Sequence, residues 1–493
     1  MSNHLHPQDF DRFQQLAAQH AAIPVARTIS ADLDTPVTAF HKVAFGRPHA
    51  FLLESVEGGE QWGRYSFLGA DFRGRIRLSG DSLTLIAPDG ASTTLDGGLD
   101  SFRKLVFEEI APLPDAPRFY GGAVGVIGYD WVRQIENIGN RHTAPDGWDD
   151  MEFLLTDTVV IFDNLKGKMQ VVTVARPERE GGAEAAFAAA QGRIAAVVAR
   201  LKGALPPLPA ASGHPPEFIV DTSPEAFAAN VARAREYIAA GDIMQVVLSR
   251  RWSAPFEEDP LNLYRAIRAL NPSPYMYLIR LNDRAVVGSS PEILVRIEDG
   301  EAVVRPIAGT RRRGRTPADD AAMELELLAD PKERAEHLML LDLGRNDLGR
   351  IAATGTVRVR EQMVIERYSH VMHMVSDVVA IPDPEVDAFD ILKATFPAGT
   401  VSGAPKIRAM QIIEELEVNR RGPYAGAVGY IGANGNLDTA ITIRTAIVEP
   451  GVVHIQAGAG LVADSVPELE ELETRNKAAA MMAAVRQAAQ GLP

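Results

Sequence analysis

Short apolar runs separated by polar and glycine-rich segments recur along the first part of the chain. Their length and their β-branched residues are typical of strands, whereas longer stretches with helical periodicity predict helices. The expected strands are 50–55, 82–87, 158–163 and 169–175. The expected helices lie near 8–20, 100–109 and 183–203.

Beyond a proline-rich segment the chain alternates more strongly between the two element types. Helices are expected to begin at Ser223-Pro224 and at Asp259-Pro260, where a capping side chain precedes a proline. Strands in series, with helices at irregular spacing, favour an α+β fold over a regular βαβ repeat. The apolar runs of this part predict strands at 243–252, 275–281, 285–290, 293–299 and 301–309.

The proline-rich segment is the clearest boundary in the chain. Its prolines crowd within 206–217, which is typical of a semi-rigid extended linker. A chain of 493 residues exceeds one ordinary core, so two domains are expected. We therefore predict an N-terminal domain over 1–205, a linker over 206–217 and a C-terminal domain over 218–493.

Composition limits the classes of partner. Hydrophobic residues make up 46% of the chain, and 50 basic against 65 acidic residues give a net charge of −15. Because no dense basic cluster is present, nucleic acid and anionic membranes are poor partners. No apolar run reaches the roughly eighteen residues of a spanning helix, and the first residues lack a secretory signal. We expect a cytoplasmic protein.

Cysteine is absent from the chain. Its absence excludes disulfides, thiolate metal sites and every mechanism that needs a cysteine nucleophile.

Two Glu-x-x-Glu pairs are the first candidate for a functional site. Glu333/Glu336 and Glu470/Glu473 each lie in a stretch that reads as helix, where residues three apart share one face. Magnesium prefers hard oxygen ligands and keeps several waters, so a site divided between two helices is plausible. An isolated pair is also common on a solvated helix face.

Helix capping offers a competing role for some of these residues. Asp330, Pro331 and Glu333 fit the N-cap, N1 and N3 positions of one helix. Ser465 and Glu468 fit a capping box at the start of the other, which would leave Glu470 and Glu473 free.

Three glycine-rich turns lie in the same half. Gly309 and Thr310 end a strand before a run of arginines, and their backbone N–H groups suit a carboxylate-bearing ligand, although a basic surface turn is an alternative. Thr400 lies in a loop that enters a helix, whose N-terminus favours an anion. The third turn is 457–460. None matches a Walker loop or a dinucleotide fingerprint.

His373 and a repeated glycine-rich segment complete the pattern. His373 lies in a short valine-rich run that reads as a strand, where a histidine is either a core residue or a catalyst. The segments 120–129 and 424–433 agree closely in sequence, which indicates either a duplication or shared composition.

Nine motifs occur in the order seen in chorismate-utilising enzymes, and the chain most closely resembles the large, synthase subunit of anthranilate synthases. They are GSSPE (288–292), PIAGTRRRG (306–314), DPKERAEHLMLLDLGRND (330–347), HVMHMVS (370–376), FPAGTVSGAPK (396–406), RRGPYAGAVGY (420–430), ITIRTA (441–446), QAGAG (456–460) and ELEELETRNKA (468–478). The resemblance implies a two-layer antiparallel β-sandwich core flanked by helices, with a smaller N-terminal regulatory region and a chorismate-binding catalytic domain.

The resemblance also implies roles for individual residues. Glu336 and Glu473 would bind Mg²⁺ directly, and Glu333 and Glu470 through water. Glu292 would be the general acid for the leaving 4-hydroxyl, with His373 acting in the later loss of pyruvate. Residues expected to hold chorismate are Gly309, Thr310, Thr400, Tyr424, Arg444, Gly458, Ala459, Gly460 and Lys477.

The residues at two positions distinguish this chain from relatives that catalyse other reactions of chorismate. Isochorismate-forming and salicylate-forming relatives carry a lysine base where this chain has Gln245, and common aminodeoxychorismate synthases carry lysine where it has Ala308. The resemblance therefore implies amination of chorismate with ammonia and elimination of pyruvate, giving anthranilate for tryptophan biosynthesis. The alternatives are an aminodeoxychorismate synthase component I and a non-catalytic tryptophan-binding subunit.

The same resemblance extends to regulation and partners. The motifs LLES, RYSFLG and NPSPYM look like a tryptophan feedback site, and the residues it implies are Glu54, Ser55, Arg64, Pro274, Tyr275 and Met276. Because the chain has no cysteine, a glutamine amidotransferase small subunit would have to supply the ammonia. We expect a hetero-oligomer of the two.

Overall fold

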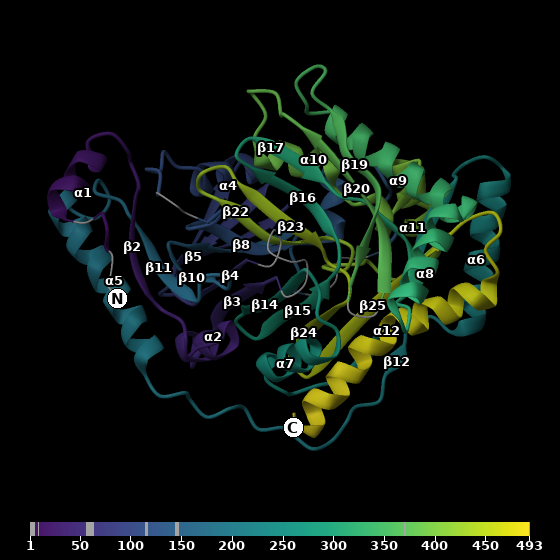
Figure 1. Ribbon diagram of the computed structural model, residues 1–493, viewed down its shortest axis with the longest axis horizontal. Helices are drawn as coiled ribbons and strands as arrows, with labels where there is room; N and C mark the ends of the chain where they lie inside the picture. Colours follow the sequence, from purple (N-terminus) through teal and green to yellow (C-terminus); the bar gives the residue numbers. More distant parts are fainter. Residues whose placement is uncertain are drawn as a thin grey trace.

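Two large antiparallel sheets pack face to face in the computed structural model, which describes residues 5–7, 9–55, 64–113, 117–142, 147–368 and 371–492 (Figure 1). The N-terminal half forms β1 (Leu5–His6), α1 (Phe10–Ala17), β2 (Ile23–Ser30), α2 (Pro36–Ala44), β3 (His49–Glu54), β4 (Tyr65–Gly69), β5 (Phe72–Ser79), β6 (Ser82–Ile86), β7 (Ser92–Asp96), α4 (Gly98–Val106), β8 (Gly122–Ile127), the 3-10 helix η1 (Tyr129–Gln134), β9 (Met151–Thr156), β10 (Thr158–Asp163), β11 (Lys168–Ala175) and α5 (Ala183–Lys202).

The C-terminal half begins after the proline-rich segment. It forms β12 (Ile219–Val220), α6 (Pro224–Ala239), β13 (Gln245–Pro255), α7 (Pro260–Leu270), β14 (Tyr275–Leu281), β15 (Arg284–Ser290), β16 (Ile293–Glu298), β17 (Glu301–Val304), β18 (Ile307–Arg312), α8 (Pro317–Ala329), α9 (Pro331–Gly349), β19 (Arg358–Arg367), β20 (Val371–Ala380), α10 (Ala388–Thr395), the 3-10 helix η2 (Gly399–Val401), β21 (Gly403–Ala404), α11 (Lys406–Leu416), β22 (Ala427–Gly432), β23 (Leu437–Ile441), β24 (Thr445–Glu449), β25 (Val452–Leu461) and α12 (Pro467–Gln490).

The predicted strands and helices are found close to their expected positions, with one exception. The run 301–309 is two strands, β17 and β18, because Pro306 has no N–H to donate to a ladder. The α+β class and the two-layer antiparallel core are confirmed.

Period-two alternation explains why the strands form two layers with helices outside them. In β14, Tyr277 and Ile279 face the other sheet, whereas Met276 and Leu278 pack beneath the helices. Helices α2, α5, α7 and α12 cover one sheet, and α4, α9 and α10 cover the other (Figure 1). None of the helices formed by the described residues is long and apolar enough to cross a membrane.

Each half of the chain contributes strands to both sheets. One sheet has the order β1-β2-β11-β10-β4-β3-β14-β15-β24-β25-β13-β12, and the other has the order β18-β20-β17-β16-β23-β22-β8-β9-β5-β6-β7. Counting outward from the β3/β14 and β8/β22 junctions, the strand order of one half repeats that of the other, except that β18 and β19 pair with β20 at the edge of the second sheet and have no counterparts in the N-terminal half. This order agrees with duplication as the origin of the repeated glycine-rich segment.

The two copies of that segment meet at the centre of the second sheet. They form β8 and β22, which pair with Gly125 opposite Gly429. A Cβ atom on either glycine would lie 2.1 Å from a carbonyl oxygen of a neighbouring strand, that of Glu152 or of Asp438. Glycine is therefore required where the neighbouring strands approach most closely.

Residues 206–217 cross between the halves without forming a helix or strand. The carbonyls of Pro206 and Pro207 lie 3.2 and 3.1 Å from His41 Nε2, and Asn262 donates to the carbonyl of Pro209 at 3.0 Å. The segment thus lies against α2 and α7. The division into a regulatory and a catalytic domain stays a prediction, because both sheets continue across the boundary.

Candidate functional site

Helices α9 and α12 carry the two predicted carboxylate pairs. α9 begins as expected, since the Asp330 side chain caps it by accepting from the backbone of Lys332 and Glu333. The capping box predicted for α12 is wrong. Val466 is its N-cap, because Pro467 occupies the first helical position, and Ser465 Oγ instead accepts from the Val462 N–H.

The four carboxylates of these pairs lie within range of one another's charge. Burial raises the pKa of Glu336, and the negative charges of Glu333 and Glu473 raise it further. Burial also raises the pKa of Glu470, with Glu473 adding to the shift. The structure thus brings the two pairs, more than 130 positions apart in sequence, within range of each other's charge.

Cationic side chains from the substrate-binding motifs hold two of these carboxylates. Arg311 forms an ion pair with Glu333 at 2.9 Å, and Lys477 one with Glu473 at 2.7 Å. Lys477 also donates to the carbonyl of Gly458 at 3.0 Å. Among the described residues, no three His, Asp or Glu side chains converge closely enough to hold a metal ion by themselves. A bound ion would therefore need further oxygen ligands from water or substrate.

His373 lies on strand β20, as predicted, opposite Thr310 on β18. Its Nδ1 lies 3.0 Å from Thr310 Oγ1 and 3.3 Å from the carbonyl of Gly309. Since a carbonyl only accepts, this contact places the proton on Nδ1 and leaves Nε2 as the basic atom. Burial lowers the pKa of His373, and the positive charge of Arg444 contributes to the shift.

Glu292 lies between β15 and β16 and is buried. Burial raises its pKa to about 8, although the Thr400 hydroxyl, the Ile307 N–H and Lys477 favour the ionised form. The carboxyl group is therefore protonated at neutral pH and able to act as an acid.

Arg444 and Tyr424 lie at one end of the β22/β23 hairpin, Tyr424 before it and Arg444 after it. Arg444 has a positive φ of 50°, and no acidic side chain among the described residues forms an ion pair with it. Burial lowers the pKa of Arg444, whereas burial raises that of Tyr424 to about 12. A partly buried guanidinium without an acidic partner among the described residues is suited to an anionic ligand.

The glycine turn of β25 packs against residues of this region. The Ala459 side chain packs into the core, so Gly458 and Gly460 face the opposite side of the strand. A Cβ on Gly458 would lie 3.0 Å from Tyr424 Oη, and one on Gly460 would lie 2.8 Å from Gln245 Nε2. Gln245 is buried, and its Oε1 has no hydrogen-bond partner among the described residues.

Hydrogen bonds, an ion pair and charge interactions connect these residues into one group, which we call the carboxylate site. Hydrogen bonds join Gly309 to His373 and Gly458 to Lys477, and an ion pair joins Lys477 to Glu473. The charge of Arg444 acts on both His373 and Tyr424, and the charges of Glu333 and Glu473 act on Glu336. Glu292 joins the group through the charge of Lys477, and Thr400 joins it through Glu292.

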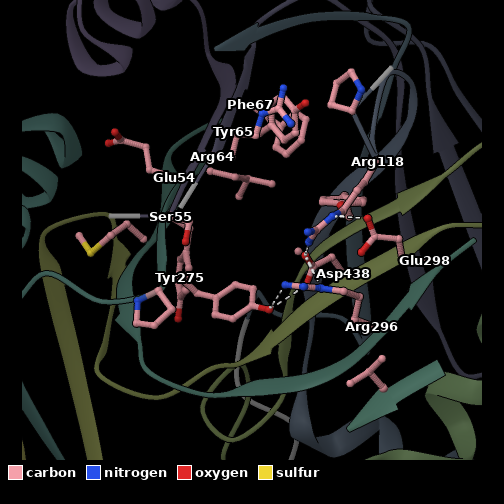
Figure 2. Close-up of a pocket in the computed structure, with 18 of the residues that line it drawn as sticks. Glu54, Ser55, Arg64, Tyr65, Phe67, Arg118, Tyr275, Arg296, Glu298 and Asp438 are labelled. Atoms are coloured by element: carbon pink, nitrogen blue, oxygen red, sulfur yellow. Dashed lines mark hydrogen bonds and ion pairs between the residues drawn. The ribbon is translucent and has the colours of Figure 1, made fainter. Parts of the chain in front are cut away.

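A separate cavity of about 780 Å³ lies between the sheets (Figure 2). All six residues predicted to bind tryptophan line it: Glu54, Ser55, Arg64, Pro274, Tyr275 and Met276. The carboxylate of Glu54 is already engaged, however, by the Tyr264 hydroxyl and by Arg268 at 3.2 Å. Figure 2 shows this side chain directed away from the space beside Ser55.

Several charged residues of this cavity were not predicted from the sequence. Arg118 forms an ion pair with Glu298 at 2.6 Å, and Arg296 forms one with Asp438 at 3.1 Å (Figure 2). The Tyr275 hydroxyl donates to Asp438 at 3.0 Å. Arg296, Glu298 and Asp438 lie on β16 and β23, and Arg118 lies in the segment before β8, all outside any recognisable motif.

Comparison with known proteins agrees with this architecture. The chorismate binding enzyme family matches residues 51–483. The chain belongs to this family, and within it to the anthranilate synthase component 1 group.

Individual relatives cover nearly the whole chain. Anthranilate synthase component 1 of Pseudomonas aeruginosa is 48% identical, covering 98% of this chain and 99% of that protein. The crystal structure of anthranilate synthase component I from Streptococcus pneumoniae has a TM-score of 0.76 at 38% identity, covering 87% of this chain and 95% of that one. MenF, the menaquinone-specific isochorismate synthase of Escherichia coli, shares the fold with a TM-score of 0.69 at 20% identity, covering 97% of this chain and 98% of that one.

Proposed function

We propose that this protein converts chorismate and ammonia into anthranilate, pyruvate and water. The observation that carries the proposal is the grouping of complementary side chains in the carboxylate site. It combines acidic groups from two helices, a protonated carboxyl group, a basic histidine nitrogen and a guanidinium without an acidic partner among the described residues. Chorismate carries two carboxylates, a leaving hydroxyl and an enolpyruvyl ether, and each of these has a matching group in the site.

The unpaired Arg444 and the Tyr424 hydroxyl would bind the enolpyruvyl carboxylate, since arginine can hold a carboxylate through two parallel hydrogen bonds. The backbone of the glycine turn and the Thr310 hydroxyl would hold the ring end. With both carboxylates fixed, C2 of the ring would be held in place for the incoming amine.

Magnesium would be held by Glu336 and Glu473 directly and by Glu333 and Glu470 through water. Their grouping, with raised pKa values for Glu336 and Glu470, supports a place for a divalent cation. When bound, the ion would neutralise the ring carboxylate and withdraw electron density from the ring. Arg311 and Lys477 balance part of the negative charge in the structure described here.

Proton transfers follow from the environments of two groups. As ammonia forms a bond to C2, Glu292 would protonate the departing 4-hydroxyl, which leaves as water. In the second stage, Nε2 of His373 would take the proton from C2 while the C3–O bond breaks. The released enolpyruvate then becomes pyruvate by gaining a proton, and the ring becomes aromatic.

Product identification tests the reaction. Purified protein incubated with chorismate, Mg²⁺ and an ammonium salt should produce a fluorescent amine with the mass of anthranilate. Formation of 4-amino-4-deoxychorismate or of isochorismate would contradict the proposal. Chelator should abolish turnover, and added Mg²⁺ should restore it.

Ammonia is proposed to come from a glutamine amidotransferase subunit in a hetero-oligomer. This chain has no cysteine to act as the glutaminase nucleophile. The protein alone should turn over with ammonium salt and not with glutamine. Glutamine-dependent turnover by this chain alone would contradict the proposed partner and would not affect the proposal for the synthase reaction.

Tryptophan is proposed to inhibit by binding in the cavity of Figure 2. Aromatic and apolar side chains from both halves line it, including Tyr65, Phe67, Pro274 and Met276. An occupant there would contact strands of both halves and so change how they pack. Inhibition that is competitive with chorismate and insensitive to changes in this cavity would contradict the assignment.

A further inference from the structure

A buried ion pair behind the carboxylate site has no role in the chemistry proposed above. Glu417 ends α11, and Arg421 follows four residues later, with side-chain exposures of 6% and 1%. The guanidinium grips the carboxylate through two hydrogen bonds, Nε to Oε2 at 2.9 Å and Nη2 to Oε1 at 2.7 Å. Because apolar residues of similar volume usually stabilise a core at least as well, such a pair calls for another reason.

The remaining N–H groups of Arg421 bind two backbone carbonyls that belong to substrate-holding elements. Nη1 donates to the Val401 carbonyl at 2.6 Å, directly after Thr400. Nη2 donates to the Val247 carbonyl at 2.8 Å, and Val247 lies opposite Gly460 in the β13/β25 ladder. One planar group therefore fixes the Thr400 turn relative to the glycine turn.

The Glu417 carboxylate also accepts hydrogen bonds from a residue of β13. Its Oε1 accepts from the backbone N–H and from the hydroxyl of Ser249, each at 2.8 Å. Ser249 lies opposite Gly458, and Gln456 of β25 donates to its hydroxyl at 2.8 Å. The carboxylate thus holds β13 in register with the strand that carries the glycine turn.

Aromatic rings from both halves of the chain pack on the guanidinium. Its central carbon lies 4.7 Å from the centre of the Tyr129 ring and 5.6 Å from that of Tyr424. Asp130, next to Tyr129, accepts from the Gly422 N–H at 2.9 Å. The segment that presents Tyr424 is therefore held by Arg421 and by the N-terminal half.

We infer that Arg421 and Glu417 form a positioning pair that sets Tyr424, Thr400 and the glycine turn at the spacing that chorismate requires. This inference rests on the proposed function, because it assumes that these three elements hold the substrate. Arg421 touches none of the reacting atoms. Its loss should weaken substrate binding more than it alters the acid–base groups.

The test replaces both partners together, with Arg421→Met and Glu417→Leu, so that no buried charge is left unpaired. The KM and the directly measured Kd for chorismate should each rise by at least about tenfold, since small misplacements of binding groups are costly. The pH profile of kcat should keep its shape, because Glu292 and His373 are unchanged.

A second buried pair provides a matched control. Arg176 and Glu108 form an ion pair at 2.7 Å in the N-terminal half, with a side-chain exposure of 8% for each. Arg176 also pairs with Asp157 at 2.7 Å, and Arg73, 3.1 Å from that carboxylate, still holds it when Arg176 is removed. None of these residues belongs to the substrate-holding elements. The double variant Arg176→Met/Glu108→Leu should lower the melting temperature comparably while changing the Kd for chorismate less than about twofold.

Three outcomes separate the possibilities. Wild-type protein that neither binds nor converts chorismate would refute the proposed function before any variant is compared. If the wild type is active and both double variants bind chorismate equally well, the Arg421 pair is structural only and the inference fails. If the double variant does not fold, Arg421→Lys decides the matter. That variant keeps the charge beside Glu417 but cannot span two carbonyls, so a wild-type Kd there would overturn the inference.

Discussion

The carboxylate site and the cavity of Figure 2 differ in how their charges are satisfied. In the cavity, Arg118 and Arg296 already have acidic partners. In the carboxylate site, Arg444 has none among the described residues, and the buried Oε1 of Gln245 has no donor. Charges that are already paired need no occupant, whereas a partly buried guanidinium without an acidic partner favours the binding of an anion.

This contrast teaches which kind of occupant each region accepts. The cavity is suited to a largely apolar molecule without net charge, such as the proposed amino acid. The carboxylate site is suited to a molecule with negative charge, such as chorismate. The following changes test that contrast.

Neutralising the carboxylates proposed to bind magnesium should have the largest effect. Glu336→Gln or Glu473→Gln should lower kcat/KM by roughly 10³-fold, because several kcal/mol of charge stabilisation are lost. Calorimetry should show weaker Mg²⁺ binding and unchanged tryptophan binding in the distant cavity. Asp342→Asn is the control on α9, since that carboxylate is 71% exposed and is paired with Arg345. If it matched the two variants, a general effect of helix charge would explain the loss.

Removing the arginines should change stability in opposite directions. Arg444→Met eliminates a partly buried charge that has no acidic partner among the described residues, so the melting temperature should rise or stay constant while kcat/KM falls by about 10²-fold. Arg296→Met leaves the buried Asp438 with only the Tyr275 hydroxyl and a longer ion pair to Arg118 at 3.8 Å, which should cost about 3 kcal/mol of unfolding free energy. Calorimetric melting of both variants checks the signs. Equal destabilisation would show that the contrast between the regions is wrong.

Filling the cavity should affect regulation and leave catalysis largely intact. Ser55 lines the space next to Tyr275 (Figure 2), and Ser55→Phe introduces a ring where the occupant would sit. We expect the tryptophan concentration for half inhibition to rise by about 10²-fold, equivalent to about 2.7 kcal/mol, with kcat nearly unchanged. Ser55→Ala adds no volume and should shift inhibition only a few-fold. Unchanged inhibition in Ser55→Phe would remove tryptophan from this cavity.

Local periodicity predicted much of the fold, because strands such as β10 and β14 carry their own alternation and turn signals. It did not predict that both halves share two sheets. The junctions Leu52 to Leu278 and Gly125 to Gly429 join residues far apart in sequence, and no local pattern records their register. The break within 301–309 was missed because Pro306 was included in an apolar run.

The candidate site likewise combines features that the local sequence predicts with features that depend on the tertiary fold. Helical spacing placed Glu333 with Glu336, but only the tertiary fold brings this pair within range of the charge of Glu473. Ser465 was given a capping role that Pro467 prevents. Tryptophan binding by Glu54 stays a prediction, although Tyr264 and Arg268 already contact its carboxylate. Arg296 and Asp438 escaped notice because a paired charge on a strand has no motif.

The smallest expected effect concerns pH. If Glu292 acts as an acid, the free enzyme needs it protonated, so kcat/KM should fall as pH rises through about 8. Thr400→Val removes a hydroxyl that favours the ionised carboxylate, so the pKa of Glu292 should rise and the falling limb should move to higher pH.

Stability provides an independent check of the same group. Since burial raises the pKa of Glu292 from its ordinary value of 4.5 to about 8, the folded protein holds one more proton than the unfolded chain between those values. Its contribution to stability is complete below about 4.5 and is lost as pH rises through about 8. As pH rises from 6 to about 9, the melting temperature of Glu292→Gln should therefore increase relative to that of the wild type. A constant difference between the two proteins would show that Glu292 is ionised throughout, and another group would have to protonate the leaving hydroxyl.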